Sequence, residues 1–236
     1  MSHPLWLNEG VMNNAHTEIV FILDRSGSMQ AMVEPAISGF NRLLREQQQV
    51  PGQARFTLVL FDDQYELPFL SVPIAEVVEL DTSTFVPRGS TALLDAIGRT
   101  IDDLGGTLAA TPEKDRPGQV IIAILTDGEE NASNRYSWEK VAKRIRHQSE
   151  KYQWQFLFLG PQDAIATAGK MSIGANNTTN FAMNEHSYTS SKGALSRKMS
   201  AFRRSSQGDT DAATVHDAAA PLEALREEEE RKDDGK

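Results

Sequence analysis

The stretch VFILDRSGSMQ, residues 20–30, places an apolar run directly before one carboxylate and two hydroxyls. The apolar run is rich in β-branched and large side chains, which is typical of a buried strand. Asp24, Ser26 and Ser28 then follow at every second position. Gly27, between the serines, permits a tight turn, so alternate side chains of the bent loop can point the same way. The stretch therefore predicts a buried strand that ends in three oxygen donors.

The rest of the chain alternates between strand patterns and helix patterns. Strands are predicted at 17–23, 55–61, 64–71, 119–125, 153–159 and 178–183, and helices at 35–48, 92–108, 137–150, 161–171 and 187–204. The short join after residue 61 predicts an antiparallel hairpin, and the uniformly apolar run at 119–125 is typical of a parallel strand buried on both faces. We therefore expect an α/β fold, a doubly wound three-layer sandwich with a mostly parallel central sheet and one antiparallel edge strand.

The charge pattern divides the chain into four parts. These are an N-terminal extension at 1–16, an α/β domain at 17–186, a basic helix that packs on the domain at 187–204, and an acidic tail at 205–236. The basic helix holds five bases and no acid, with Leu195, Met199 and Phe202 as its apolar stripe. The tail holds ten acids and four bases and no aromatic residue, so we expect it to be disordered apart from a helical patch at 221–231.

The composition argues against several classes of protein. The 236 residues include no cysteine, which excludes disulfides and thiolate metal sites. The longest strongly apolar run, 120–125, is far too short to cross a bilayer, and the N-terminus lacks the basic start and apolar core of a signal peptide. A net charge of −9 without a large basic face argues against nucleic acid. We expect a cytoplasmic protein that binds neither nucleic acid nor membrane, although a lack of cysteine also fits an export route.

Two further segments carry oxygen donors to the same predicted edge of the sheet. Asp127 follows the strand at 119–125, and Thr91 lies in the loop before the helix at 92–108. In open α/β sheets, ligands bind beyond the carboxyl ends of the strands, where the strand order reverses. The set contains no histidine or cysteine, and an all-oxygen set suits a hard cation such as Mg²⁺, or Mn²⁺.

Three motifs in order, DRSGS at 24–28, GSTAL around Thr91 and TDG around Asp127, resemble the metal-ion-dependent adhesion site of the von Willebrand factor type A family. The resemblance covers roughly residues 17–186 and is closest to bacterial cytoplasmic members. It implies a doubly wound fold with a central parallel sheet and one antiparallel edge strand.

The resemblance also implies a role for each residue of the motifs. Ser26, Ser28 and Thr91 would ligate the metal through their hydroxyls. Asp24 and Asp127 would act directly or through water, orienting the hydroxyls. Because neutral hydroxyls leave the cation under-neutralised, an open position would attract an Asp or Glu of a partner protein. The implied function is a non-catalytic, metal-dependent protein-binding module that acts as a scaffold or regulator in a cytoplasmic complex.

Four residues near the motifs are candidates for the rim that contacts the partner, namely Arg25, Arg88, Ser90 and Glu129. The simpler interpretation of the two arginines is that they are solvated. The simpler interpretation of Glu129 and its neighbour Glu130 is a helix start, where acids are favourable.

Two alternative hypotheses remain open. Asp24 could be the nucleophile of a Mg²⁺-dependent phosphatase or phosphoacceptor, since these hold an Asp at the end of a first strand. Such sites need a second acid two residues on, where this chain has Ser26, or an acid pair with a reachable lysine, so we expect no enzyme activity. In the second hypothesis, the acidic tail pairs with the basic helix or places a carboxylate at the metal rim; a purely solubilising tail is the simpler alternative.

Overall fold

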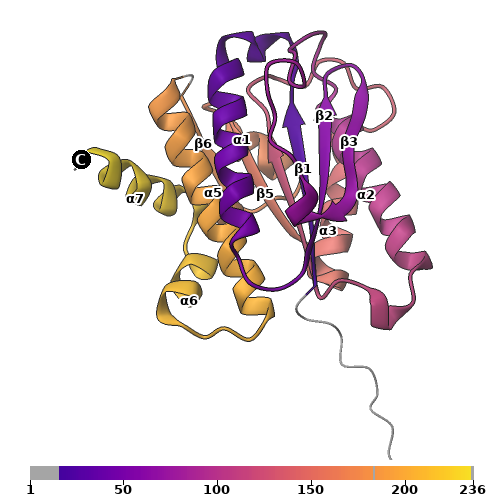
Figure 1. Ribbon diagram of the computed structural model, residues 1–236. Helices are drawn as coiled ribbons and strands as arrows, with labels where there is room; N and C mark the ends of the chain where they lie inside the picture. Colours follow the sequence, from indigo (N-terminus) through magenta and orange to yellow (C-terminus); the bar gives the residue numbers. More distant parts are fainter. Residues whose placement is uncertain (1–15, 183, 235–236) are drawn as a thin grey trace, which may run out of the picture.

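A six-stranded sheet lies between two layers of helices in the computed structural model, which describes residues 16–182 and 184–234 (Figure 1). The strands are β1 (Thr17–Asp24), β2 (Ala54–Phe61), β3 (Tyr65–Pro73), β4 (Gln119–Leu125), β5 (Gln155–Gly160) and β6 (Thr178–Asn180). The α-helices are α1 (Val33–Gln48), α2 (Leu93–Ala110), α3 (Trp138–Tyr152), α4 (Ala164–Lys170), α5 (Glu185–Ser206), α6 (Ala212–Ala219) and α7 (Leu222–Asp234). Short 3-10 helices are η1 (Gly27–Met32), η2 (Ile74–Glu76), η3 (Glu113–Asp115) and η4 (Ala175–Asn177).

The sheet has the order β3-β2-β1-β4-β5-β6, and only the β2–β3 pairing is antiparallel. This confirms the predicted doubly wound α/β fold with one antiparallel edge strand. All eight residues of β1 are buried, because its alternate side chains enter two separate cores. Phe21 and Leu23 pack with residues of α1 and α5, whereas Val20 and Ile22 pack with residues of α2 and α3.

The strand order reverses between β1 and β4, which are neighbours in the sheet although about a hundred residues apart. Leu23 pairs with Leu125, so Asp24 and Thr126 leave the sheet side by side. Parallel strands that diverge in this way open a crevice beyond their carboxyl ends. The topology therefore brings the DRSGS and TDG motifs to one place.

The basic residues of α5 are mostly inside the protein. Lys192, Lys198 and Arg203 are each at most 3% exposed. Arg203 donates to the carbonyl oxygens of Gln47 at 2.6 Å and Val50 at 3.3 Å, where α1 ends. A cation at a helix C-terminus satisfies carbonyls that have no partner within the helix. The bases of α5 thus hold neighbouring elements together and form no basic face.

The prediction that residues 205–236 are disordered is wrong for the described part of that segment. α6 and α7 lie there, and α7 includes the predicted helical patch at 221–231. Leu222 and Leu225 are fully buried in the same core as α1 and α5. Their spacing of three residues places both on one face of α7, which packs on α5 and on β6. Two leucines among many charged residues only weakly predict a packed helix from the sequence. In the structure they anchor α7 against the edge strand β6.

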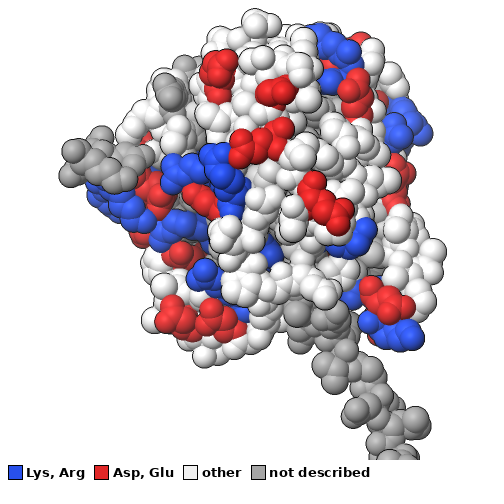
Figure 2. All heavy atoms as spheres, viewed as in Figure 1, with Lys and Arg blue, Asp and Glu red and all other residues white. Residues whose placement is uncertain are grey.

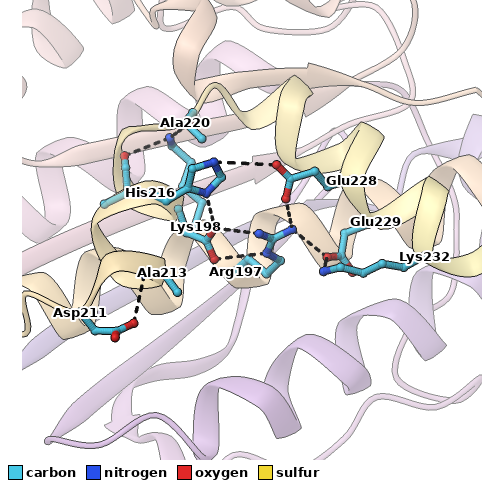
Figure 3. A network of polar contacts seen from close by, with 11 residues as sticks. Arg197, Lys198, Asp211, Ala213, His216, Ala220, Glu228, Glu229 and Lys232 are labelled. Carbon is cyan, nitrogen blue, oxygen red and sulfur yellow. Dashed lines mark hydrogen bonds and ion pairs between the residues drawn. The ribbon is translucent and has the colours of Figure 1, made fainter.

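Acidic and basic residues are interspersed over the face seen in Figure 2, and they gather most densely on the side of α5, α6 and α7. Arg197 of α5 is central to this charge pairing, with Asp217 at 2.7 Å, Glu229 at 2.9 Å and Glu228 at 3.0 Å (Figure 3). The hypothesis that the acidic tail pairs with the basic helix is confirmed by these contacts. No helix in the described ranges is long and apolar enough to cross a membrane. The predicted extension lies outside the described residues except for His16.

Candidate metal centre

Three hydroxyl oxygens from different segments converge beside Gly128. A Cβ atom at Gly128 would lie 3.0 Å from Thr91 Oγ1, 3.2 Å from Ser28 Oγ and 3.8 Å from Ser26 Oγ. The two serine oxygens are 3.1 Å apart. Glycine leaves this space free, and any other residue would put its side chain among the hydroxyls. The structure therefore brings together the three residues that the sequence analysis assigned as hydroxyl ligands.

Asp24 lies directly beneath these hydroxyls and is fully buried. One carboxylate oxygen accepts from the backbone N–H of Ser26 at 2.6 Å, and the other accepts from Thr126 Oγ1 at 2.6 Å. Burial raises the pKa of Asp24 to about 6, although these hydrogen bonds oppose the rise. A buried carboxylate in this position holds the loop in shape and favours a positive charge nearby.

Asp127 completes the cluster from the other side of the crevice. Its Oδ1 accepts from Ser28 Oγ at 2.7 Å. Its Oδ2 is buried and has no hydrogen-bond partner among the described residues. Burial raises the pKa of Asp127 as well. A buried carboxylate oxygen without a partner is costly, and a cation or an ordered water would relieve that cost.

Backbone contacts hold the three loops together. The Gly27 N–H donates to the Gly89 carbonyl at 3.2 Å, the Thr91 N–H donates to Asn131 Oδ1 at 2.9 Å, and the Asn131 N–H donates to the Thr91 carbonyl at 3.0 Å. Gly89 has a φ of +65°, in the left-handed region that favours glycine. Gly27 does not have a positive φ, and its lack of a side chain instead permits the close approach to Gly89. The loop geometry therefore depends also on Asn131, which lies outside the three motifs.

Glu130 is a structural residue that the sequence analysis missed. Its carboxylate accepts from the backbone N–H groups of Leu94, Ala132 and Ser133 at 2.7 to 3.0 Å, and from Ser133 Oγ at 2.7 Å. α3 begins only at Trp138, so the interpretation of the two glutamates as a helix start is wrong. Glu130 ties the TDG loop to the start of α2, whereas Glu129 is exposed.

The two arginines assigned to the rim form ion pairs within the protein. Arg25 is 4% exposed, so it is not available to a partner on the surface, and that assignment is wrong. Its guanidinium pairs with Asp62 at 3.1 Å and with Glu66 at 2.7 Å. Arg88 is half exposed and pairs with the same two carboxylates at 2.8 and 2.6 Å. Since Asp62 and Glu66 lie beyond the end of β2 and in β3, only the folded hairpin brings these partners together.

Ser90 and Glu129 are exposed beside the cluster, as a rim requires. Unlike Arg25, neither side chain forms an ion pair or hydrogen bond with the described loops around the cluster. Both remain candidates for contact with a partner.

The fold can be matched to known structures, although no family model and no curated protein matches the sequence. Proximal thread matrix protein 1 from the mussel byssus matches with a TM-score of 0.53 and 15% identity over 78% of this chain and 46% of that one. The ArnB paralog VWA2 of Sulfolobus acidocaldarius matches with a TM-score of 0.51 and 18% identity over 80% and 46%. The manganese-loaded TRAP protein of Plasmodium vivax matches with a TM-score of 0.51 and 16% identity over 75% and 72%.

This chain has the von Willebrand factor type A fold. It spans about half the length of the first two matched structures. At these identities the likeness concerns the fold alone, so the chemistry of the site must be argued from its residues. In this type A fold, the hydroxyl cluster lies where the topology reverses, beyond the ends of β1 and β4.

The residues at this edge of the type A fold fit a hard divalent cation. Every donor is an oxygen, and three of the donors are neutral hydroxyls. Asp127 Oδ2 is a buried acceptor in need of a partner. The described ranges contain no group of three or more His, Cys, Asp or Glu side chains suited to a metal, so a cation here would depend on the hydroxyls. This donor set suits Mg²⁺ or Mn²⁺ and would disfavour metals that prefer nitrogen or sulfur.

Proposed function

We propose that this chain is a non-catalytic, divalent-metal-dependent protein-binding module. The observation that carries the proposal is the convergence of Ser26, Ser28 and Thr91 hydroxyls on one point, next to an unpartnered oxygen of Asp127. Ser26, Ser28 and Thr91 would hold the metal directly. Asp127 would bind it directly or through water, and the fully hydrogen-bonded Asp24 would orient the loop.

The partner in this proposal is a protein that presents an Asp or Glu side chain. The bound metal would supply the positive charge that attracts the partner's carboxylate. Neutral hydroxyls leave much of that charge uncompensated, so a carboxylate from outside completes the balance. The ion pairs of Arg25 and Arg88 support a role for the metal in binding the acid, since both guanidinium groups already pair with Asp62 and Glu66. Ser90 and Glu129 would contact the partner around the metal.

Mg²⁺ and Mn²⁺ are the proposed cofactors. The manganese in the matched TRAP structure makes Mn²⁺ a sensible probe alongside Mg²⁺. We further propose a role as a scaffold or regulator in a cytoplasmic complex, without nucleic acid or membrane as a partner. The mixed charges on the surface in Figure 2 support the absence of nucleic acid, because they form no continuous basic face in that view.

Calorimetric titration of the full chain with Mg²⁺ and with Mn²⁺ tests the metal site. The wild type is expected to bind one ion, and Asp127→Ala is expected to weaken binding by about 100-fold because it removes the unpartnered oxygen. Asp115→Ala is the matched control, since Asp115 is exposed in η3, before the start of β4. A wild type that binds neither ion would overturn the proposal.

A pull-down with and without a chelator then tests partner capture. Proteins retained by the wild type should be lost with EDTA and with Asp127→Ala, but kept with Asp115→Ala. Retention that is insensitive to both EDTA and Asp127→Ala would contradict metal-dependent capture.

A Mg²⁺-dependent phosphatase or phosphoacceptor is the second candidate. The burial of Asp24 argues against it, because a nucleophile must reach the phosphorus atom and this carboxylate is fully buried, with each oxygen held by a hydrogen bond. Incubation with acetyl phosphate or a chromogenic phosphate ester separates the two functions. Mg²⁺-dependent turnover that is lost in Asp24→Asn would replace the binding module with an enzyme.

A further inference from the structure

A buried phenol from α5 lies at the same edge of the sheet as the hydroxyl cluster. Tyr188 is 1% exposed, in the first turns of α5. Its ring packs edge-to-face on Phe181, with 5.0 Å between ring centroids, and Phe181 is held by its N–H on the carbonyl of Gly160, where β5 ends. On its other side, the Lys192 ammonium lies 4.3 Å from the ring centroid. The apolar neighbours and the burial account for an aromatic ring at this position.

The hydroxyl of Tyr188 is not explained by this packing. Tyr188 Oη is buried and has no hydrogen-bond partner in the described part of the chain. A phenylalanine would fill the same space without burying an unpaired polar atom, which costs stability. The hydroxyl therefore calls for a partner outside the part of the chain that the structure describes.

Two other tyrosines in this protein pair their hydroxyls. Tyr65 Oη lies 3.0 Å from Thr100 Oγ1, and Tyr136 Oη donates to Asp102 at 2.9 Å. Both of these tyrosines lie on the side of α2 and α3, within a second core or at its margin. Tyr188 differs from them in both position and bonding.

Backbone contacts at the end of β5 connect Tyr188 with the hydroxyl cluster. Phe181, on which the Tyr188 ring packs, is bonded to the Gly160 carbonyl. The neighbouring Leu159 carbonyl accepts from the Thr126 N–H at 3.1 Å, one residue before Asp127. Burial raises the pKa of Tyr188 well above its usual value, and the negative charges of Asp127 and Asp24 raise it further. The phenol therefore stays protonated and can act only as a neutral donor or acceptor. Asp127 Oδ2, the acceptor without a partner, is the complementary group on the side of the cluster.

We propose that Tyr188 is a positioning residue of the metal centre, whose hydroxyl donates through a bound water to the free oxygen of Asp127. A buried water needs two to four polar partners, and a phenol donor and a carboxylate acceptor supply two of them. The contact fixes the orientation of Asp127, which is the residue proposed to meet the metal. This assignment rests on the proposed metal-binding function.

The test compares Tyr188→Phe with the wild type in two measurements. The first is Mn²⁺ affinity by calorimetry, and the second is the midpoint of thermal unfolding in EDTA. Loss of an orienting contact is expected to weaken Mn²⁺ binding by about 10-fold. The midpoint in EDTA should be unchanged or higher, because the substitution removes a buried hydroxyl without a partner.

Tyr65→Phe is the matched control. It removes a hydroxyl that is paired with Thr100, and the Tyr65 ring packs against the core on the opposite face of the sheet from Tyr188. Its expected result is the reverse, namely a lower midpoint in EDTA and an unchanged Mn²⁺ affinity.

Each outcome for Tyr188→Phe has a distinct meaning. Unchanged Mn²⁺ affinity would overturn the assignment and leave the metal site standing. A lower midpoint in EDTA together with weaker binding would make the hydroxyl structural, which also overturns it. A wild type without Mn²⁺ binding would instead overturn the proposed function, and the assignment of Tyr188 would fall with it.

Discussion

The edge of the sheet at Asp24 and the helical layer of α5 to α7 are both rich in buried or half-buried polar groups. The two regions differ in the partners that these polar groups have. In the helical layer, a base meets acids: Arg197 pairs with three carboxylates, and Lys198 donates to the backbone where α6 ends (Figure 3). In the hydroxyl cluster at the sheet edge, acidic and neutral oxygens gather, and the two nearby arginines, Arg25 and Arg88, pair with Asp62 and Glu66 instead. Ion pairs between acids and bases stabilise the fold. A cluster of oxygen atoms without a cation is instead suited to bind one.

The pKa directions of the acids express the same contrast. Burial alone would raise the pKa of Asp217, but hydrogen bonds from Arg197 and His216 and their positive charges lower it overall. Burial raises the pKa of Asp24 to about 6, and no cation opposes it. The carboxylates of the helical layer are thus stabilised in their charged form by bases of the protein. Those of the hydroxyl cluster at the sheet edge would be stabilised in that form by a bound cation.

The largest expected effect comes from filling the point where the hydroxyls converge. In Gly128→Ala the new methyl would lie 3.0 Å from Thr91 Oγ1 and 3.2 Å from Ser28 Oγ, in the space a metal would need. We expect Mn²⁺ affinity to fall by more than about 100-fold in calorimetry, beyond what the loss of an orienting residue causes.

Gly106→Ala is the matched control for Gly128→Ala. No atom lies within 4 Å of a Cβ at Gly106, which is in α2. Alanine there should stabilise the helix by up to about 1 kcal/mol and leave Mn²⁺ affinity unchanged. If Gly128→Ala still binds Mn²⁺ like the wild type, the hydroxyls do not form the metal site.

The pH dependence of stability distinguishes the two regions next. In EDTA, Asp24 has a folded pKa of about 6 against an ordinary value of 3.8, so the folded state binds the proton more tightly than the unfolded state. Its contribution is fully present below pH 3.8 and is lost as pH rises through 6, with a size of about 3 kcal/mol at most. Urea unfolding in EDTA between pH 4 and 8 measures this contribution.

Asp24→Asn is the comparison for the pH series, because asparagine has no proton to bind in this range. The wild type should lose stability relative to Asp24→Asn as pH rises from 4 to 7. Excess Mn²⁺ should reduce this loss, because a cation favours the charged carboxylate. Parallel curves for the two proteins in EDTA would contradict the unbalanced charge at the sheet edge.

Breaking the helical layer should have a smaller effect, and on stability alone. Arg197→Met leaves Asp217, Glu228 and Glu229 without their shared base, and we expect a loss of about 2 kcal/mol for this partly buried network. For a chain of this length that lowers the thermal midpoint by about 4 to 8 °C. Mn²⁺ affinity should not change.

The control for Arg197→Met is Arg99→Met, which breaks a more exposed pair with Asp103 at 3.3 Å and removes a guanidinium that lies 4.2 Å from the centroid of the Tyr65 ring. An exposed pair of this kind contributes about 0.3 to 0.5 kcal/mol and an exposed cation–π contact about 0.5 to 1 kcal/mol, so the loss should stay below that of Arg197→Met. Weaker Mn²⁺ binding in Arg197→Met would mean that the two regions are coupled, and the comparison between them would no longer hold.

The smallest expected effect concerns the two neighbouring glutamates. Glu130→Gln keeps one carbonyl oxygen but loses part of a network of four hydrogen bonds, so we expect a loss of about 1 kcal/mol and a several-fold weaker Mn²⁺ affinity. Glu129→Gln should change neither quantity, since Glu129 is exposed. Equal effects of the two substitutions would show that Glu130 does not hold the loop.

The amino-acid sequence by itself determined the sheet and the position of the candidate site. Strands such as TEIVFIL and QVIIAIL can be recognised because each contains a continuous run of apolar residues, and alternation of strands with helices leaves few topologies. The carboxyl ends of parallel strands lie at one edge of a sheet, so the sequence placed Asp24 and Asp127 at the same edge, and the structure adds that β1 and β4 are neighbours there.

Only the tertiary structure decided which polar groups are already satisfied. Arg25 was expected at the rim, yet its partners Asp62 and Glu66 reach it only through the β2–β3 hairpin. Tyr188 and Asp127 are 61 residues apart in the chain, and no local pattern reveals that both end in a buried atom without a partner among the described residues. Apolar periodicity is a local property of the chain, whereas pairing between polar groups depends on distances that exist only after folding.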